Sequence, residues 1–312
     1  MMNLNNKQRL SLGILPRSIS LKISLDIGCN AKCVMCDDHY YKKNNFNYRE
    51  LDRLIGFLDA TMIKKIDLIG GEPLVDKDNL LKIIKKIRKK GIDTTFTTNG
   101  VLLNKKTLDK MTSYGINEIT ISLDAAGKKH DMLRGIPGLF NKINSIADHC
   151  NQNHRNFKIN LNTIIMKNNI DSIPRLVLWA QKMNINSISL LRLVRYNNAY
   201  ESLRVNNRDI IGLLFKLIKL RSCFIFKKPL AMKNDGIKGC SYLTHRLIVN
   251  DKGQVTPCWK KEDRGFFIDR PLKKLYLDKN FRNYLLDKIN NCGDNCPNCL
   301  IVSLIRPLNY VK

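Results

Sequence analysis

The sequence has few acidic residues and no long apolar run. Asp and Glu number 27 against 54 Lys and Arg, so this chain of 312 residues carries a formal net charge of +27. No run approaches the roughly 18 apolar residues that a membrane span needs. The first ten residues, MMNLNNKQRL, also lack the apolar core of a signal peptide. We therefore expect a cytoplasmic protein with no membrane partner.

The excess of positive charge suits three kinds of partner, namely a nucleic acid, an anionic lipid surface or a negatively charged substrate. The lysines are spread along the whole chain, and most fall on solvated helix faces, such as the one that carries Lys82, Lys86 and Lys90. A surface that follows a phosphate backbone needs clustered charge with stacking aromatics. We therefore expect no nucleic-acid partner, and we retain an anionic small molecule as a substrate class.

Strand and helix patterns alternate through the first two thirds of the sequence. Apolar and polar residues alternate over 19–27, which predicts a strand. Six strand-helix steps imply right-handed crossovers and a parallel sheet, so we predict an α/β fold, a partial (β/α)6 parallel barrel. Functional groups of such a fold gather at the carboxyl ends of the strands. The later strands are expected at 65–69, 92–97, 116–123, 157–166 and 186–194, and the helices at 49–62, 77–90, 105–113, 138–150 and 170–183.

The pattern changes after residue 196. An isolated helix is expected near 207–221, followed by a hairpin over 246–258 and a cysteine-rich tail. This change predicts a second, small domain. We divide the chain into an N-terminal segment (1–17), the barrel domain (18–195), a helical connector (196–239) and a small cysteine-rich C-terminal domain (240–312).

The ten cysteines cluster instead of spreading at the intervals of a disulfide framework, which favours metal ligands. Cys29, Cys33 and Cys36 follow the first strand with the spacing C-x3-C-x2-C. Three thiolates this close can hold three corners of a 4Fe-4S cluster and leave the fourth iron without a protein ligand. The alternatives are a zinc ion with His39 or Asp37 as fourth ligand, or three chance thiols.

This spacing, after the first strand, resembles the signature of radical S-adenosylmethionine (SAM) enzymes. In that family the open iron binds the amino and carboxylate groups of SAM, and an injected electron cleaves SAM to a 5'-deoxyadenosyl radical. The resemblance implies that Met35, just before the third cysteine, packs near the adenine as a polarisable apolar side chain.

A second motif, Gly70-Gly71-Glu72-Pro73, closes the second predicted strand. By itself it marks only a turn. The resemblance implies that this loop takes the ammonium group of SAM with backbone carbonyls and the glutamate. Glu72 is then the ammonium contact, and the two glycines are positions of close backbone approach.

Polar residues also close the third and fourth predicted strands. Singly, each is a turn or a helix cap; together they resemble the SAM pocket and substrate loop of the same family. The resemblance implies SAM contacts at Asn99, Ser122 and Asn162, the latter two with its ribose or carboxylate. It further implies that Asp124 faces the substrate, and that Asp124 and Arg134 are the candidate catalytic residues.

The hairpin and tail cysteines, with Gly253 and Cys258 in the arrangement G-x4-C, resemble a SPASM domain in its shortened twitch form. They imply one auxiliary 4Fe-4S cluster, most simply held by four thiols with Cys292 as the spare or alternative ligand; a structural zinc site is the competing interpretation. We expect Cys150 and Cys223 to be buried inert thiols. The tail and hairpin thiols are Cys240, Cys258, Cys292, Cys296 and Cys299.

An auxiliary cluster with four cysteine ligands is limited to electron transfer or a structural role, which favours net oxidation, as in twitch-containing dehydrogenases. With three ligands its open iron could hold substrate, as in a twitch enzyme of molybdopterin synthesis. We predict an oxidoreductase-type radical SAM enzyme that abstracts hydrogen from a polar small molecule or sugar, with flavodoxin or ferredoxin as reductant. The alternatives are a peptide maturase, an epimerase and, outside enzymes, an iron-sulfur electron carrier.

Overall fold

The structure is a computed structural model. It describes residues 4–25, 27–36, 48–193, 198–220, 224–227, 245–250, 253–256, 266–290 and 300–305. The chain divides into two units. Unit 1 contains Met1–Gly28, Lys42–Phe96 and Leu230–Cys296, and unit 2 contains Cys29–Tyr41, Thr97–Pro229 and Pro297–Lys312.

Unit 1 is built on a mostly parallel sheet with β1 at its centre. The strands β1 and β2 pair in parallel, and β2 pairs in parallel with the first residues of β3. On the other side of β1 lies β8, also parallel, and β9 pairs with β8 in the antiparallel direction. The strands are β1 (Ile19–Leu25), β2 (Ile63–Gly70), β3 (Asp93–Thr98), β8 (Arg246–Val249) and β9 (Val255–Thr256).

Amphipathic patterns account for the elements of this unit. Alternate residues of β1 are buried, as the period of two predicts. Along α3 (Lys77–Lys89), apolar residues at helical spacing are buried and the lysines face outward. Helix α2 (Tyr48–Gly56) and the short 3-10 helix η1 (Pro73–Asp76) complete the helices beside β2 and β3.

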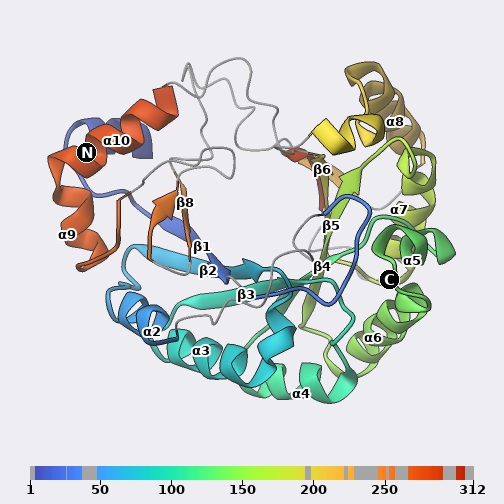
Figure 1. Ribbon diagram of the computed structural model, residues 1–312, viewed down its shortest axis with the longest axis horizontal. Coiled ribbons are helices and arrows are strands. Elements are labelled where there is room, and N and C mark those ends of the chain that lie inside the picture. Colours follow the sequence, from blue (N-terminus) through green and yellow to red (C-terminus); the bar gives the residue numbers. More distant parts are fainter. Residues whose placement is uncertain are drawn as a thin grey trace. The chain divides into compact units, whose positions relative to one another are not determined.

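Three further helices of unit 1 lie together, where α10 contacts both α1 and α9 (Figure 1). They are α1 (Asn6–Ser11), α9 (Leu272–Leu277) and α10 (Lys279–Asn290). Phe281 of α10 is fully buried, with its ring edge-on to Phe266 and Tyr276 at centroid distances of 5.4 and 5.2 Å. These ring contacts hold residues 266–290 together, and the contact of α10 with α1 joins them to the rest of the unit.

Unit 2 continues the parallel series. The last residues of β3 pair with β4, followed by β5 and β6 in order, and β10 and then β7 add antiparallel strands beyond β6. The strands are β4 (Glu118–Ser122), β5 (Lys158–Ile165), β6 (Ser187–Arg192), β7 (Ile225–Lys227) and β10 (Leu300–Ile305). The helices are α4 (Lys105–Ser113), α5 (Lys128–Arg134), α6 (Leu139–Asn153), η2 (Ile170–Ser172), α7 (Ile173–Lys182), η3 (Asn198–Leu203) and α8 (Asn207–Lys219).

The predicted fold class is confirmed, because β1 to β6 follow one another in parallel with helices between them, the order of a partial (β/α)6 barrel. The helix expected over 49–62 was too long: α2 ends at Gly56, although Leu58 and Met62 remain buried. Helix α5 was not predicted. Within the described residues, no helix is long and apolar enough to cross a membrane.

The C-terminal region contributes strands to both units. The expected hairpin is present as β8 and β9, and β8 lies beside β1; β10, which was not predicted, lies beside β6. All five C-terminal cysteines, together with Cys223, lie outside the described residues. The separate cluster domain at 240–312 therefore stays a prediction.

Truncation of Phe281 tests the packing of residues 266–290. Phe281→Ala should lower the free energy of unfolding by about 3–5 kcal/mol, because it leaves a cavity between two aromatic rings. The matched control is Phe267→Ala in the same unit, where the side chain is 53% exposed and the change should be within about 0.5 kcal/mol. Chemical denaturation followed by circular dichroism measures both, and equal losses would contradict the packing described.

Candidate functional site

The three cysteines after β1 lie in unit 2 within an apolar cluster. Cys33 and Met35 are buried, 6% and 1% exposed, and Cys29 and Cys36 pack against the same cluster. The amide of Cys36 donates to the carbonyl of Cys33 at 3.1 Å, which closes a tight turn. The surrounding buried residues are Ala31, Ala125, Leu133, Met166 and Leu193. Met35 is thus positioned with the cysteines, but its contact with adenine stays a prediction.

Two of the three sulfur atoms have nitrogen donors within reach. Arg134 Nη1 lies 3.6 Å from Cys33 Sγ, and Asn99 Nδ2 lies 3.6 Å from Cys29 Sγ. Asn99 also donates to the side chain of Asn30 at 2.9 Å. N–H groups directed at sulfur stabilise the thiolate form that a metal cluster requires.

A buried ion pair holds the arginine in place. Arg134 Nη2 lies 2.6 Å from Asp124 Oδ2, and the other carboxylate oxygen of Asp124 accepts the amide of Ile164 at 2.9 Å. Burial alone would lower the pKa of Arg134, but the Asp124 carboxylate and the Cys33 sulfur raise it above its ordinary value. Asp124 is fully buried in this arrangement, and its role facing substrate stays a prediction.

His130 contacts the backbone of Asp124, the carboxylate residue of this ion pair. The backbone N–H of Asp124 donates to His130 Nδ1 at 3.2 Å. Burial, followed by the charge of Arg134, lowers the pKa of His130 to about 3, so the imidazole is neutral at physiological pH. Its Nε2 has no hydrogen-bond partner among the described residues.

The predicted SAM contacts Ser122 and Asn162 are brought together, because they face each other as register partners in β4 and β5. Sequence reasoning missed Asn169, which is 2% exposed and donates from Nδ2 to the carbonyls of Asp124 and Ile164 at 2.9 and 2.8 Å. It ties the ends of β4 and β5. The polar run Lys167-Asn168-Asn169, which begins two residues after the end of β5, was the available signal.

The Gly70-Gly71-Glu72-Pro73 motif lies in unit 1, at the end of β2. A Cβ atom on Gly70 would lie 2.0 Å from the carbonyl oxygen of Leu25, and one on Gly71 would lie 2.2 Å from that of Ile27. The amide of Glu72 donates to the carbonyl of Gly28 at 3.2 Å, directly before the first cysteine of the chain. The backbone partner of this close approach is the segment that leads into the cysteine loop, and the role of the two glycines in binding SAM stays a prediction.

Glu72 is completely buried, and its Oε1 accepts the amide of Leu74 at 3.1 Å at the start of η1, which begins with Pro73. One carboxylate oxygen of Glu72 thus caps the first turn of η1. Its contact with the ammonium group of SAM stays a prediction.

The cysteine loop fits an iron-sulfur cluster. It offers three sulfur ligands, and beside them the guanidinium of Arg134, whose buried Nε has no hydrogen-bond partner among the described residues. A cluster of anionic sulfur atoms suits a buried cation with an unpaired N–H. Asp37 and His39, the possible fourth ligands of a zinc site, lie outside the described residues.

A parallel β/α sheet with three cysteines in the loop after its first strand defines the class of radical SAM enzymes. The family model described as the Radical SAM superfamily matches residues 23–180, more than half of the chain. The chain belongs to the radical SAM superfamily, which implies a 4Fe-4S cluster and SAM as cofactors.

Similar proteins include GTP 3',8-cyclase of Clostridium perfringens (strain SM101 / Type A), 30% identical over 212 residues. That match covers 65% of this chain and 64% of the relative, less than two thirds of the relative's length. A probable GTP 3',8-cyclase of Methanocaldococcus jannaschii is 24% identical over 87% of this chain and 94% of its own.

Among solved structures, Streptococcus suis SuiB bound to S-adenosylmethionine has a similar fold, with a TM-score of 0.71 and 15% identity over 91% of this chain and 70% of SuiB. SuiB has also been solved with its precursor peptide SuiA, with a TM-score of 0.64 and 15% identity over 88% of this chain and 68% of SuiB. At this identity the likeness concerns the fold.

The tight approach at Gly71 gives a prediction with a matched control. Gly71→Ala should cost at least about 1–3 kcal/mol of stability, because the new Cβ meets backbone that cannot move aside as a side chain would. Gly56→Ala adds the same methyl group where no atom of the described residues lies within 4 Å, and it should be neutral or slightly stabilising. Urea denaturation compares them; a neutral Gly71→Ala would refute the close approach.

The buried His130 predicts a loss of stability in acid. Its folded pKa of about 3 lies below the ordinary 6.5, so below pH 6.5 the unfolded chain takes up a proton that the folded protein does not. Wild type should therefore lose about 1.4 kcal/mol more than His130→Gln between pH 7.5 and 5.5. Denaturation at both pH values measures the difference, and identical pH dependence would contradict a neutral buried imidazole.

Proposed function

We propose that this radical SAM enzyme abstracts a hydrogen atom from a polar, anionic small molecule or sugar and oxidises it. The observation that carries the proposal is the cysteine loop held against Arg134 and Asn99 in unit 2. When bound, the cluster and SAM supply a 5'-deoxyadenosyl radical as the hydrogen acceptor. Cys29, Cys33 and Cys36 would hold the cluster.

The surrounding residues would bind and orient. Arg134 and Asn99 donate N–H groups toward two of the sulfur atoms and stabilise their anionic form. Asp124 keeps the arginine charged and directed at Cys33. Glu72 would take the ammonium group of SAM, while Ser122 and Asn162, side by side on β4 and β5, would contact its ribose or carboxylate.

An auxiliary 4Fe-4S cluster would make the overall reaction an oxidation. Cys240, Cys258, Cys296 and Cys299 would hold it, with Cys292 as the alternative ligand. With four thiolate ligands it would serve as an electron acceptor. Loss of a hydrogen atom, then of one electron and one proton, converts a substrate C–H and its neighbouring O–H into a carbonyl.

Two findings support an anionic substrate. The net charge of +27 would attract it over long range. Relatives that share 30% and 24% of residues carry the name GTP 3',8-cyclase, which points to a nucleoside triphosphate. Nucleotides are therefore the first substrates to test, followed by sugar phosphates.

A peptide substrate is the second candidate. It is supported by the fold likeness to SuiB, a protein solved with the precursor peptide SuiA. The two candidates differ in which molecule stimulates SAM cleavage, so one assay decides between them.

Anaerobic reconstitution should yield about eight irons per chain, about four per cluster. Dithionite and SAM should then release 5'-deoxyadenosine, and Cys33→Ala should abolish the release. Glu72→Gln, which keeps the acceptor oxygen for Leu74, should raise the KM for SAM roughly tenfold or more, because a charged hydrogen bond is weakened. Chromatography of the nucleoside and iron analysis measure these quantities.

Substrate is tested with deuterated nucleotides, sugar phosphates and peptides, by following deuterium into 5'-deoxyadenosine. Transfer from an anionic small molecule, with a product two hydrogens lighter, is the expected result. Transfer from peptides alone would establish the second candidate. A reduced protein that leaves SAM intact would instead indicate an electron carrier.

A further inference from the structure

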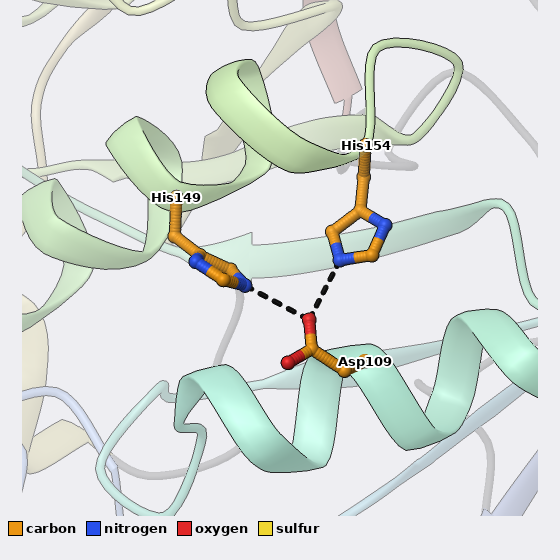
Figure 2. A group of neighbouring side chains, drawn as sticks. All are labelled: Asp109, His149 and His154. Carbon is orange, nitrogen blue, oxygen red and sulfur yellow. Dashed lines mark hydrogen bonds and ion pairs between the residues drawn. The ribbon is translucent and has the colours of Figure 1, made fainter.

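Three side chains of types that bind metal ions, from a part of unit 2 distant in sequence from the cysteine loop, lie close together. Asp109 comes from α4, His149 from the last turns of α6, and His154 from the residue after α6, as Figure 2 shows. Asp109 Oδ1 lies 2.8 Å from His149 Nε2 and 2.7 Å from His154 Nε2. All three potential ligand atoms lie within 4.8 Å of one another.

The end of α6 creates this convergence. In a continuous helix, residues five apart point about 140° away from each other, so two histidines at this spacing would diverge. Here α6 ends at Asn153, and His154 leaves the helical conformation with φ −136° and ψ 61° while its N–H still donates to the carbonyl of Cys150. The turn brings the second imidazole back beside the first.

Burial and hydrogen bonds restrict the two histidine side chains. His149 and His154 are only 15% and 17% exposed, whereas Asp109 is 49% exposed. Asn153 Nδ2 contacts His149 Nδ1 at 3.1 Å and the His149 carbonyl at 3.0 Å, which fixes the ring.

Both imidazoles are directed at the same carboxylate oxygen, Asp109 Oδ1. Zinc with ligand bonds of about 2.0–2.1 Å in a tetrahedron needs ligand atoms about 3.3 Å apart. The observed separations of 2.8 and 2.7 Å reach that value by small side-chain rotations. The pair His149-x4-His154 also has the H-x3–5-H spacing of zinc sites.

We propose that Asp109, His149 and His154 bind one divalent transition-metal ion, with zinc as the best match. Two imidazoles and one carboxylate are borderline ligands, whereas calcium and magnesium take oxygen sets. The exposed side of Asp109 leaves the fourth position to water. The bound ion joins α4 to the end of α6.

The test uses the cluster-loaded full-length protein under anaerobic conditions. After dialysis against a chelator, zinc is added against a competing chelator, and bound zinc per chain is measured by mass spectrometry. The expected result is one zinc ion beyond any held by cysteines. Asp109→Asn, His149→Gln and His154→Gln should each weaken zinc binding by more than about 100-fold, because each removes a ligand and the loss of an outer-shell partner alone typically costs about 10–100-fold.

Asp148→Asn is the matched control, because it removes an exposed carboxylate next to His149 on the same helix without removing a ligand. It should bind zinc as wild type does. Equal zinc affinity in Asp109→Asn and Asp148→Asn would overturn the proposal. Circular dichroism compares the folding of the ligand variants with that of wild type, and a wild-type protein that binds no zinc beyond its cysteines would overturn the proposal by itself.

Zinc K-edge X-ray absorption gives an independent readout that iron does not obscure. Nitrogen and oxygen neighbours at about 2.0–2.1 Å, with the multiple scattering of imidazole, are expected. A sulfur shell at about 2.3 Å would assign the zinc to cysteines and refute the site.

Discussion

The buried ion pair between Asp124 and Arg134 organises unit 2 around the cysteine loop. A charge without water must be paired, and breaking such a pair leaves the partner charge stranded. Arg134 closes α5, Asp124 follows β4, and the same carboxylate accepts the amide of Ile164 in β5. The pair therefore joins a helix and two strand ends, while the free edge of the guanidinium faces Cys33.

In unit 1, close approach between two backbone segments holds the residues that precede the cysteine loop. Gly70 and Gly71 leave no room for side chains against the carbonyls of residues 25–28, and the amide of Glu72 bonds to the last of these residues. The chain thus enters the cysteine loop from a segment held by β2. The segment before the loop thus depends on the absence of side chains at Gly70 and Gly71, whereas Cys33 within the loop lies beside a charged side chain.

Local patterns in the sequence were enough for most of the parallel series. The helix expected at 105–113 has those bounds in the structure, because its apolar spacing and its Asn104 cap are both local signals. The helix from 49 was predicted too long, because Leu58 and Met62 continue the apolar spacing after the chain has left the helix at Gly56. Periodicity reports burial, and burial does not require helix.

Two elements, α5 and β10, were not predicted from the sequence, because their local patterns are weak or misleading. Helix α5 is short and bounded by glycines, so its periodicity is weak, and β10 follows a cysteine-rich run that reads as a tail. The cysteine motif is compact enough to recognise from its spacing. By contrast, Arg134 and Cys33 are 101 residues apart, and no spacing rule connects an arginine to a sulfur over that distance.

The Asp109 site illustrates how one chain can keep two kinds of metal apart. His149 and Cys150 are adjacent, yet the cysteine is 3% exposed and burial raises its pKa to about 11. A protonated, buried thiol does not compete as a ligand, so an ion bound beside it meets only imidazole and carboxylate. The thiols of the first loop instead lie beside the N–H groups of Arg134 and Asn99. The two ligand sets thus differ in their surroundings, because the thiol next to His149 is buried inside α6, whereas Cys29 and Cys33 have nitrogen donors within reach.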